Sequence, residues 1–146
     1  MLKALEFVAV MSATLFAGAA LYINVAEHPA RMLQSTREAA LQWAPSYKRA
    51  TWLQAPLAVV SGLSGAAAWF AGGGGGWLVG AVLIASVVPF TFAVIMPTNN
   101  RLLSASRDLS SDETRNLLAR WGNLHAVRTL LSLCAAALFS CLIVWA

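Results

Sequence analysis

The stretch RWGNLHAVRTLLSLCAAALFSCLIVW, residues 120–145, decides the fold of this chain. From residue 124 onward it is apolar, and its one charged residue, Arg128, lies near its start. A helix needs roughly 20 mostly apolar residues to cross a bilayer. Apolar residues here surround the helix rather than alternate along it, so we predict a membrane-spanning helix over residues 124–145.

The composition extends this prediction to the whole chain. Of its 146 residues 59% are hydrophobic and only 11% are charged, whereas a soluble domain carries about 25% charged residues. Three more apolar runs are long enough to span a bilayer, at residues 5–25, 51–70 and 77–96. The first run is longer than the apolar core of a secretion signal, so we expect it to be retained. We predict an all-α, integral membrane four-helix bundle, forming a single membrane domain over residues 1–146.

The basic residues predict the orientation of the bundle. Most of them lie in the two longer connections, at residues 26–50 and 97–123, whereas the connection between spans two and three has none. By the positive-inside rule both connections are cytoplasmic and the N- and C-termini lie outside. This distribution accounts for the net charge of +4 and gives no signal for nucleic-acid binding. We expect a bacterial inner (cytoplasmic) membrane as the location.

The connections differ in kind. Residues 71–76 are rich in glycine and predict a short turn, because consecutive glycines oppose a helix. The connection over residues 26–50 is expected to be partly helical and to lie on the membrane surface as an amphipathic segment. Ser110 or Ser111 caps the fourth helix, which is expected to begin near Ser111 or Asp112 and continue unbroken into the membrane. Pro29 and Pro97 are expected to mark the ends of spans one and three.

Polar residues converge at one depth of this topology, where the two longer connections meet the membrane. Trp121, His125 and Arg128 are separated by four and three residues, so they share one side of a helix. Asn24, His28 and Arg31 repeat that spacing at the end of span one, although Pro29 disfavours a helical His28 and leaves its direction open. The same depth also receives Tyr22, Glu27, Trp52, Asn99 and Asn100.

Each of these residues also has a purely structural interpretation. The tryptophans and Tyr22 fit an aromatic belt at the membrane interface. Arg31, Arg101 and Arg120 fit topology markers that face lipid phosphates, and the two asparagines fit a helix cap after Pro97. Arg128 lies one turn deeper, where a guanidinium needs a carboxylate, carbonyls or an anionic ligand. The functional interpretation is therefore most specific for Arg128 and the two histidines.

A metal site is the weaker alternative for the same residues. His28, His125 and Glu27 are the ligand types that a transition metal uses. Their positions match none of the short spacings typical of metal sites. We therefore expect no protein-bound metal, and these three residues would be its ligands if one were present.

The motifs at this depth resemble those of the anthrone oxygenase-like family of small four-span membrane proteins. The resemblance covers LYINVAEHPARM, WAPSYKRATWLQAPLA, MPTNNRLL and RWGNLHAVRTLLSL, and therefore nearly the whole chain. Carried over by position, it places His28 and Pro29 in the first motif, Pro97 with Asn99 or Asn100 in the third, and Trp121, His125 and Arg128 in the last. Characterised relatives oxidise an anthrone to an anthraquinone with molecular oxygen, and the resemblance implies that chemistry here.

Oxidation of an apolar aromatic substrate without a cofactor fits these residue types. A base must remove an acidified C–H proton, and a positive group must hold the resulting enolate or phenolate. His125 or His28 would be the base, Arg128 the anion stabiliser, and Asn99 or Asn100 a hydrogen-bond donor. Substrate contacts would come from Trp121, Trp52, Tyr22 and Glu27.

The competing class is a non-enzymatic membrane subunit that binds a quinone, a lipid or a partner protein through the same polar end. Expected partners in either case are the lipid bilayer and a small apolar aromatic or quinone-like ligand. A homo-oligomer is compatible with both functional classes, and nucleic acid is not expected as a partner.

Overall fold

The computed structural model describes residues 1–145, and there the chain forms four helical rods. Rod one comprises α1 (Leu2–Tyr22), the π-helical turn η1 (Ile23–Glu27) and α2 (His28–Met32). Rod two comprises α3 (Thr36–Ala68) and η2 (Trp69–Gly73), and rod three comprises α4 (Gly75–Phe90), η3 (Thr91–Ile95) and α5 (Met96–Leu103). Rod four is α6 (Asp112–Val144). Each rod is long and apolar enough to cross a membrane, which confirms the predicted all-α membrane four-helix bundle.

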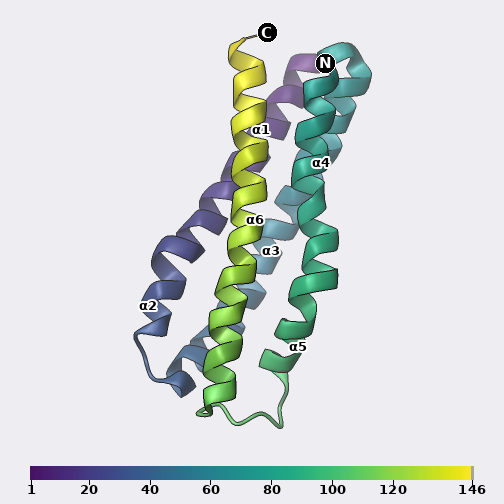
Figure 1. The fold of residues 1–146 in the computed structure, drawn as a ribbon. Helices are drawn as coiled ribbons and strands as arrows, with labels where there is room; N and C mark the ends of the chain where they lie inside the picture. The colour runs from purple at the N-terminus through teal and green to yellow at the C-terminus, as the bar shows by residue number, and fades with distance from the viewer. Residues whose placement is uncertain (146) are drawn as a thin grey trace.

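The rods form an up-and-down bundle in which chain neighbours are also neighbours in space. The helix α1 packs between α3 and α6, and α4 closes the ring by packing against the same two helices. Both termini lie at one end, together with the connection from α3 to α4 (Figure 1). We call this the terminal end, and the opposite end, with the α2–α3 and α5–α6 connections, the loop end. Which end faces the cytoplasm stays a prediction.

Pro29 and Pro97, which were expected to mark the ends of spans one and three, lie inside rods that continue past them, and where each membrane span ends stays a prediction. The backbone N–H of His28 donates to the carbonyl of Ile23, and that of Met96 donates to the carbonyl of Thr91. Each of these residues precedes a proline and bonds five residues back, so the turn is wider than an α-helical one. The wider turn makes room for a proline ring and its missing donor, and the helix continues. The expectation that Pro29 disfavours a helical His28 was therefore wrong.

The expected surface segment over residues 26–50 is also corrected. A reciprocal capping box between Ser35 and Glu38 starts α3 at Thr36, directly after a short turn. From there Ala39, Ala40 and Trp43 are buried against the other rods. Most of the expected connection, residues 36–50, is therefore the first 15 of the 33 residues of a helix that belongs to the bundle.

The start of rod four is confirmed. The Ser111 side chain accepts a hydrogen bond from the backbone N–H of Thr114, and α6 begins at Asp112. Asp112 and Glu113 lie in the first turn, where negative charge favours the helix dipole. The helix then runs unbroken past Trp121, His125 and Arg128, so these three side chains share one rigid element.

The terminal end is packed through small residues. Gly72 and Gly74 adopt φ angles of 93° and 87°, which the expected glycine turn requires. The Phe139 ring lies where a side chain on Gly65 or Gly80 would have to be. It stacks on Trp77 with the ring centroids 5.1 Å apart. Absence of a side chain at these glycines thus lets three rods approach closely around one aromatic pair.

Candidate functional site

The loop half of the bundle buries polar side chains from all four rods. The buried polar residues there are His28, Arg31, Gln54, Thr98, Asn99, Thr114, His125, Arg128 and Thr129. Burying a polar group costs free energy unless it finds a partner. We therefore asked which of these buried groups have a hydrogen-bond partner within the described chain and which do not.

His125 is anchored to rod one through Asn24. The Nδ1 atom of His125 lies 2.7 Å from Asn24 Oδ1, and the ring is 1% exposed. The Thr129 hydroxyl donates to the same Asn24 oxygen at 2.5 Å. The Asn24 amide donates from Nδ2 to the carbonyl of Gly122 at 3.1 Å. Asn24 of rod one thus contacts both the His125 ring and the backbone of α6, and it holds the ring in a fixed position relative to α6.

The same contacts fix the proton on His125. The Oδ1 atom of Asn24 can only accept, so Nδ1 of His125 must be the donor. In the neutral ring the lone pair then lies on Nε2, which is the atom able to take up a proton.

His28 has the opposite arrangement. Its Nδ1 lies 3.4 Å from Nη1 of Arg31, and a guanidinium only donates. His28 Nδ1 therefore accepts, and the ring carries its hydrogen on Nε2. That side of the ring lies against Gly122, where a side chain would collide with it. The two histidines thus differ: Nε2 of His125 carries a lone pair, whereas Nε2 of His28 carries a hydrogen and is packed against Gly122.

The indole of Trp121 lies against both histidines. Its ring centroid is 4.9 Å from that of His125 and 5.4 Å from that of His28, both at tilted angles. Trp43 meets the same indole edge-on at 5.8 Å and stacks on Tyr47 at 5.0 Å. Both predicted histidines therefore contact Trp121, beside the rings of Trp43 and Tyr47, and their shared functional role stays a prediction.

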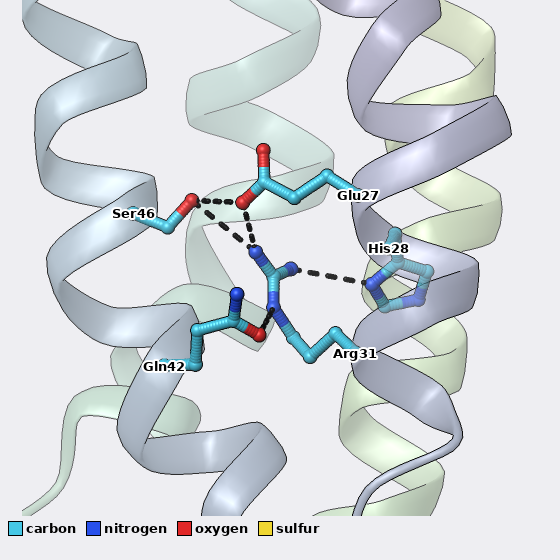
Figure 2. A network of polar contacts seen from close by, with 5 residues as sticks. All are labelled: Glu27, His28, Arg31, Gln42 and Ser46. Carbon is cyan, nitrogen blue, oxygen red and sulfur yellow. Dashed lines mark hydrogen bonds and ion pairs between the residues drawn. The ribbon is translucent and has the colours of Figure 1, made fainter.

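Arg31 is the centre of a polar cluster rather than a residue facing lipid phosphate. It is 1% exposed and forms an ion pair with Glu27 one turn earlier. Its guanidinium also donates to Ser46 Oγ at 3.2 Å and to Gln42 Oε1 at 3.3 Å. Figure 2 shows these three residues and His28 around the guanidinium, with Ser46 and Gln42 reaching across from α3. The expectation for Arg31 as a topology marker was wrong, because rod one turns this face inward.

Arg128 lies deeper in the bundle and has a neutral partner. Its Nη2 donates to Gln54 Oε1 at 2.9 Å, and its guanidinium carbon lies 5.6 Å from the centroid of the Phe16 ring. Arg128 Nε has no hydrogen-bond partner among the described residues. A cation held by an amide and an aromatic face keeps its charge available to an anionic ligand.

The remaining predicted residues divide into buried and exposed ones. Asn99 is fully buried, and within residues 1–145 neither its side-chain oxygen nor its nitrogen has a partner. Asn100 is exposed on the same helix. Trp52 is 77% exposed and Tyr22 is 60% exposed. Of these two aromatic residues, Tyr22 lines a groove between rods one and two, as does Glu27. Trp52 does not line it.

The described residues contain no group of three or more His, Cys, Asp or Glu side chains arranged to hold a metal. Glu27 is instead engaged by Arg31 and Ser46, and His28 presents Nδ1 to a guanidinium. These contacts give no support to a metal held by His28, His125 and Glu27.

Several polar partners were missed from the sequence. Thr129 follows His125 by one helical turn, and this spacing was the available signal. Glu27 and Arg31 also stand four residues apart, a typical ion-pair spacing. Ser46 and Gln42 gave no signal, since their role depends on how rod two is rotated against rod one.

Comparison with known proteins places the chain in a family. Residues 43–138, well over half of the chain, match the family described as anthrone oxygenase. This chain belongs to the anthrone oxygenase family. It is 42% identical over 64 residues to an anthrone oxygenase of Aspergillus fumigatus, a match that covers 42% of this chain and 40% of that protein.

Longer matches to other family members have lower identity. A noranthrone monooxygenase of Aspergillus flavus is 28% identical over 148 residues, covering 91% of this chain and 70% of that protein. An anthrone oxygenase of Pestalotiopsis fici is 31% identical over 113 residues, covering 64% and 77%. No solved structure matches the chain. These relatives are fungal, so they give no support to the expected bacterial membrane.

Proposed function

We propose that this chain is a membrane-embedded oxygenase that oxidises an apolar, anthrone-like aromatic substrate with molecular oxygen. The observation that carries the proposal is the buried His125, whose contact with Asn24 leaves Nε2 as a proton acceptor. Relatives named as anthrone oxygenases support the substrate class. Four apolar rods suit a substrate that partitions into lipid.

The proposed reaction balances without a cofactor. A base removes a proton from the methylene group between two aromatic rings, which leaves an enolate. The enolate gives an electron to O2, and the two radicals combine to form a carbon–oxygen bond and a peroxide that takes up a proton. Loss of the second methylene proton then breaks the O–O bond, giving a ketone and water. One atom of O2 enters the quinone and the other leaves as water.

The two histidines have different roles in this proposal. His125 takes the methylene proton on Nε2. His28 has a positioning role, because its ring contacts the Trp121 indole that lies against His125, while its own Nε2 is packed against Gly122. The sequence left the choice of base open, and the tautomers favour His125. Arg128 supplies positive charge, Asn99 brings an amide with unused hydrogen-bond capacity, and Trp121 forms the aromatic wall. We expect the loop end to face the cytoplasm, following the positive-inside rule.

The test is oxidation of a dihydroxyanthrone by the purified chain in lipid nanodiscs. Oxygen uptake and quinone absorbance are recorded, and the spontaneous rate in empty nanodiscs is subtracted. We expect His125→Ala to lower the rate by about 10²- to 10⁴-fold, the range for loss of a general base. Arg120→Ala is the matched control, because Arg120 is exposed on the same helix at the same end.

A double variant, His28→Ala with His125→Ala, decides the proposal. If it folds and still oxidises the anthrone at the wild-type rate, the histidine mechanism is wrong. Stoichiometric metal in the purified protein, with activity lost on its removal, would also overturn the cofactor-free reaction. Binding of the quinone without any oxygen uptake would favour the alternative, a non-enzymatic subunit that binds a quinone.

A further inference from the structure

Gln54 uses only part of its hydrogen-bond capacity. Its side chain is 1% exposed, and Oε1 accepts from Arg128 Nη2 at 2.9 Å. Because a guanidinium has no acceptor, the amide must turn its oxygen to Arg128 and its NH2 group elsewhere. Within residues 1–145 the Nε2 atom has no partner. An unpaired buried donor costs about 1–3 kcal/mol, so this atom is suited to an external acceptor.

Gln54 lines a groove large enough for a small aromatic molecule. The groove lies between rods one and two and has a volume of about 510 Å³, within the range typical of small-molecule sites. Its walls near Gln54 are apolar and include Ala19, Ile23, Ala50 and Leu53.

The other end of the groove is polar. Glu27 and Ser46 line it there, beside the Arg31 cluster drawn in Figure 2. Glu27 receives both Arg31 and Ser46 on Oε1, so Oε2 takes part in neither contact. Ser46 and Gln54 are eight residues apart on α3, which is about 12 Å along the helix axis. The groove therefore offers a donor at one end and an acceptor at the other, and between them it is lined by apolar side chains together with Arg49.

We propose that this groove is a binding site for the aromatic ligand outside the histidine pair, which does not line it, and that Gln54 Nε2 donates to a keto or phenolate oxygen on the ring system of that ligand. The inference rests on the proposed function for the class of ligand. Arg128 acts through Gln54: the guanidinium polarises the amide, which strengthens its N–H as a donor to an oxygen that gains negative charge. Gln54 is then a binding residue that selects aromatic molecules with an oxygen acceptor over plain hydrocarbons.

The experiment measures binding, which does not depend on oxidation. A dihydroxyanthraquinone, with its hydroxyls beside a carbonyl, is titrated into the full chain in phosphatidylcholine nanodiscs and followed by absorbance. Anthracene, which has no oxygen, is titrated in parallel by fluorescence. Gln54→Met removes the donor, and Gln54→Glu replaces it with an oxygen while keeping an acceptor for Arg128. Gln34→Met makes the same change at an exposed position outside the groove.

We expect Gln54→Met to weaken quinone binding about tenfold, equivalent to one net hydrogen bond, and to leave anthracene binding unchanged. Gln54→Glu should weaken quinone binding further, and most strongly at a pH where the dye is an anion, because two negative oxygens then repel. Gln34→Met should bind both probes as the wild type does.

Wild-type quinone binding by both Gln54 variants would overturn the inference, even if anthrone oxidation is intact. An equal loss of quinone and anthracene binding in both variants would also overturn it, since that pattern indicates distortion of the groove. Loss of quinone binding alone supports it, even if the wild type fails to oxidise an anthrone. Failure of the proposed function is thus distinguishable from failure of this inference.

Discussion

The two ends of the bundle are built from the same four rods but differ in the side chains that fill the interior. At the terminal end Gly65 and Gly80 let Phe139 pack against Trp77 among buried alanines. At the loop end large polar side chains take the place of that close packing, and Gln54, Asn99 and Arg128 each retain an unpartnered polar atom. One end maximises contact between helices, whereas the other maintains hydrogen-bond capacity that the described chain does not use. In our proposal the terminal end contributes mainly to stability and the loop end contains the reaction site.

The largest loss of unfolding free energy is expected when the Arg31 cluster is broken. Arg31→Met leaves Glu27 without its cation, and breaking a buried pair costs about 3 kcal/mol of unfolding free energy, at the lower end of the usual range because Glu27 is partly exposed. The counterpart at the terminal end is Glu6→Gln, which breaks a pair with the exposed Lys3 and should cost less than about 1 kcal/mol. Denaturation in detergent, followed by circular dichroism, measures both. If both variants lost the same unfolding free energy, the ion pairs at the two ends would not differ in their contribution to stability.

A pair of Gly→Ala substitutions sharpens the comparison. Gly80→Ala forces a methyl group into the Phe139 ring and should lower stability by about 1–3 kcal/mol, with little change in oxidation rate per folded molecule. Gly122→Ala pushes the His28 ring away from α6 and should lower the oxidation rate about tenfold or more for a similar loss of stability. The measurements are denaturation midpoints and anthrone oxidation on the same preparations. A large loss of rate in Gly80→Ala would mean that the terminal end contributes to the chemistry.

The smallest effect is expected at Trp52. This residue is 77% exposed on the bundle exterior, so Trp52→Ala should change stability by less than about 0.5 kcal/mol. Its oxidation rate should remain within twofold of the wild type. Trp121→Ala provides the contrast, because Trp121 contacts both histidines. A strong loss of quinone binding in Trp52→Ala would instead support the sequence-based prediction that this tryptophan contacts substrate.

Hydropathy was sufficient to predict the fold, because length and apolar content decide whether a helix can span a bilayer. The grouping of Trp121 with His125 followed from helical periodicity within one rod. Pairings such as Arg128 with Gln54 join residues far apart in the chain and depend on how each rod is rotated. Arg31 was misjudged because the positive-inside rule describes loop residues, whereas this residue lies in a rod that continues past Pro29.

The wide turn before Pro29 has a consequence for how rod one can tolerate changes in length. A π-helical turn accommodates one residue more than an α-helical turn in nearly the same rise. Loss of a single codon within residues 23–27 would therefore restore α-helical geometry without shortening the rod appreciably. The residues after it would keep nearly the same direction, whereas loss of a codon within α1 would rotate them by about 100°, the angle per residue of an α-helix. In that second case His28 and Arg31 would leave the interior together, so the wide turn can lose a residue where α1 cannot without moving this half of the site.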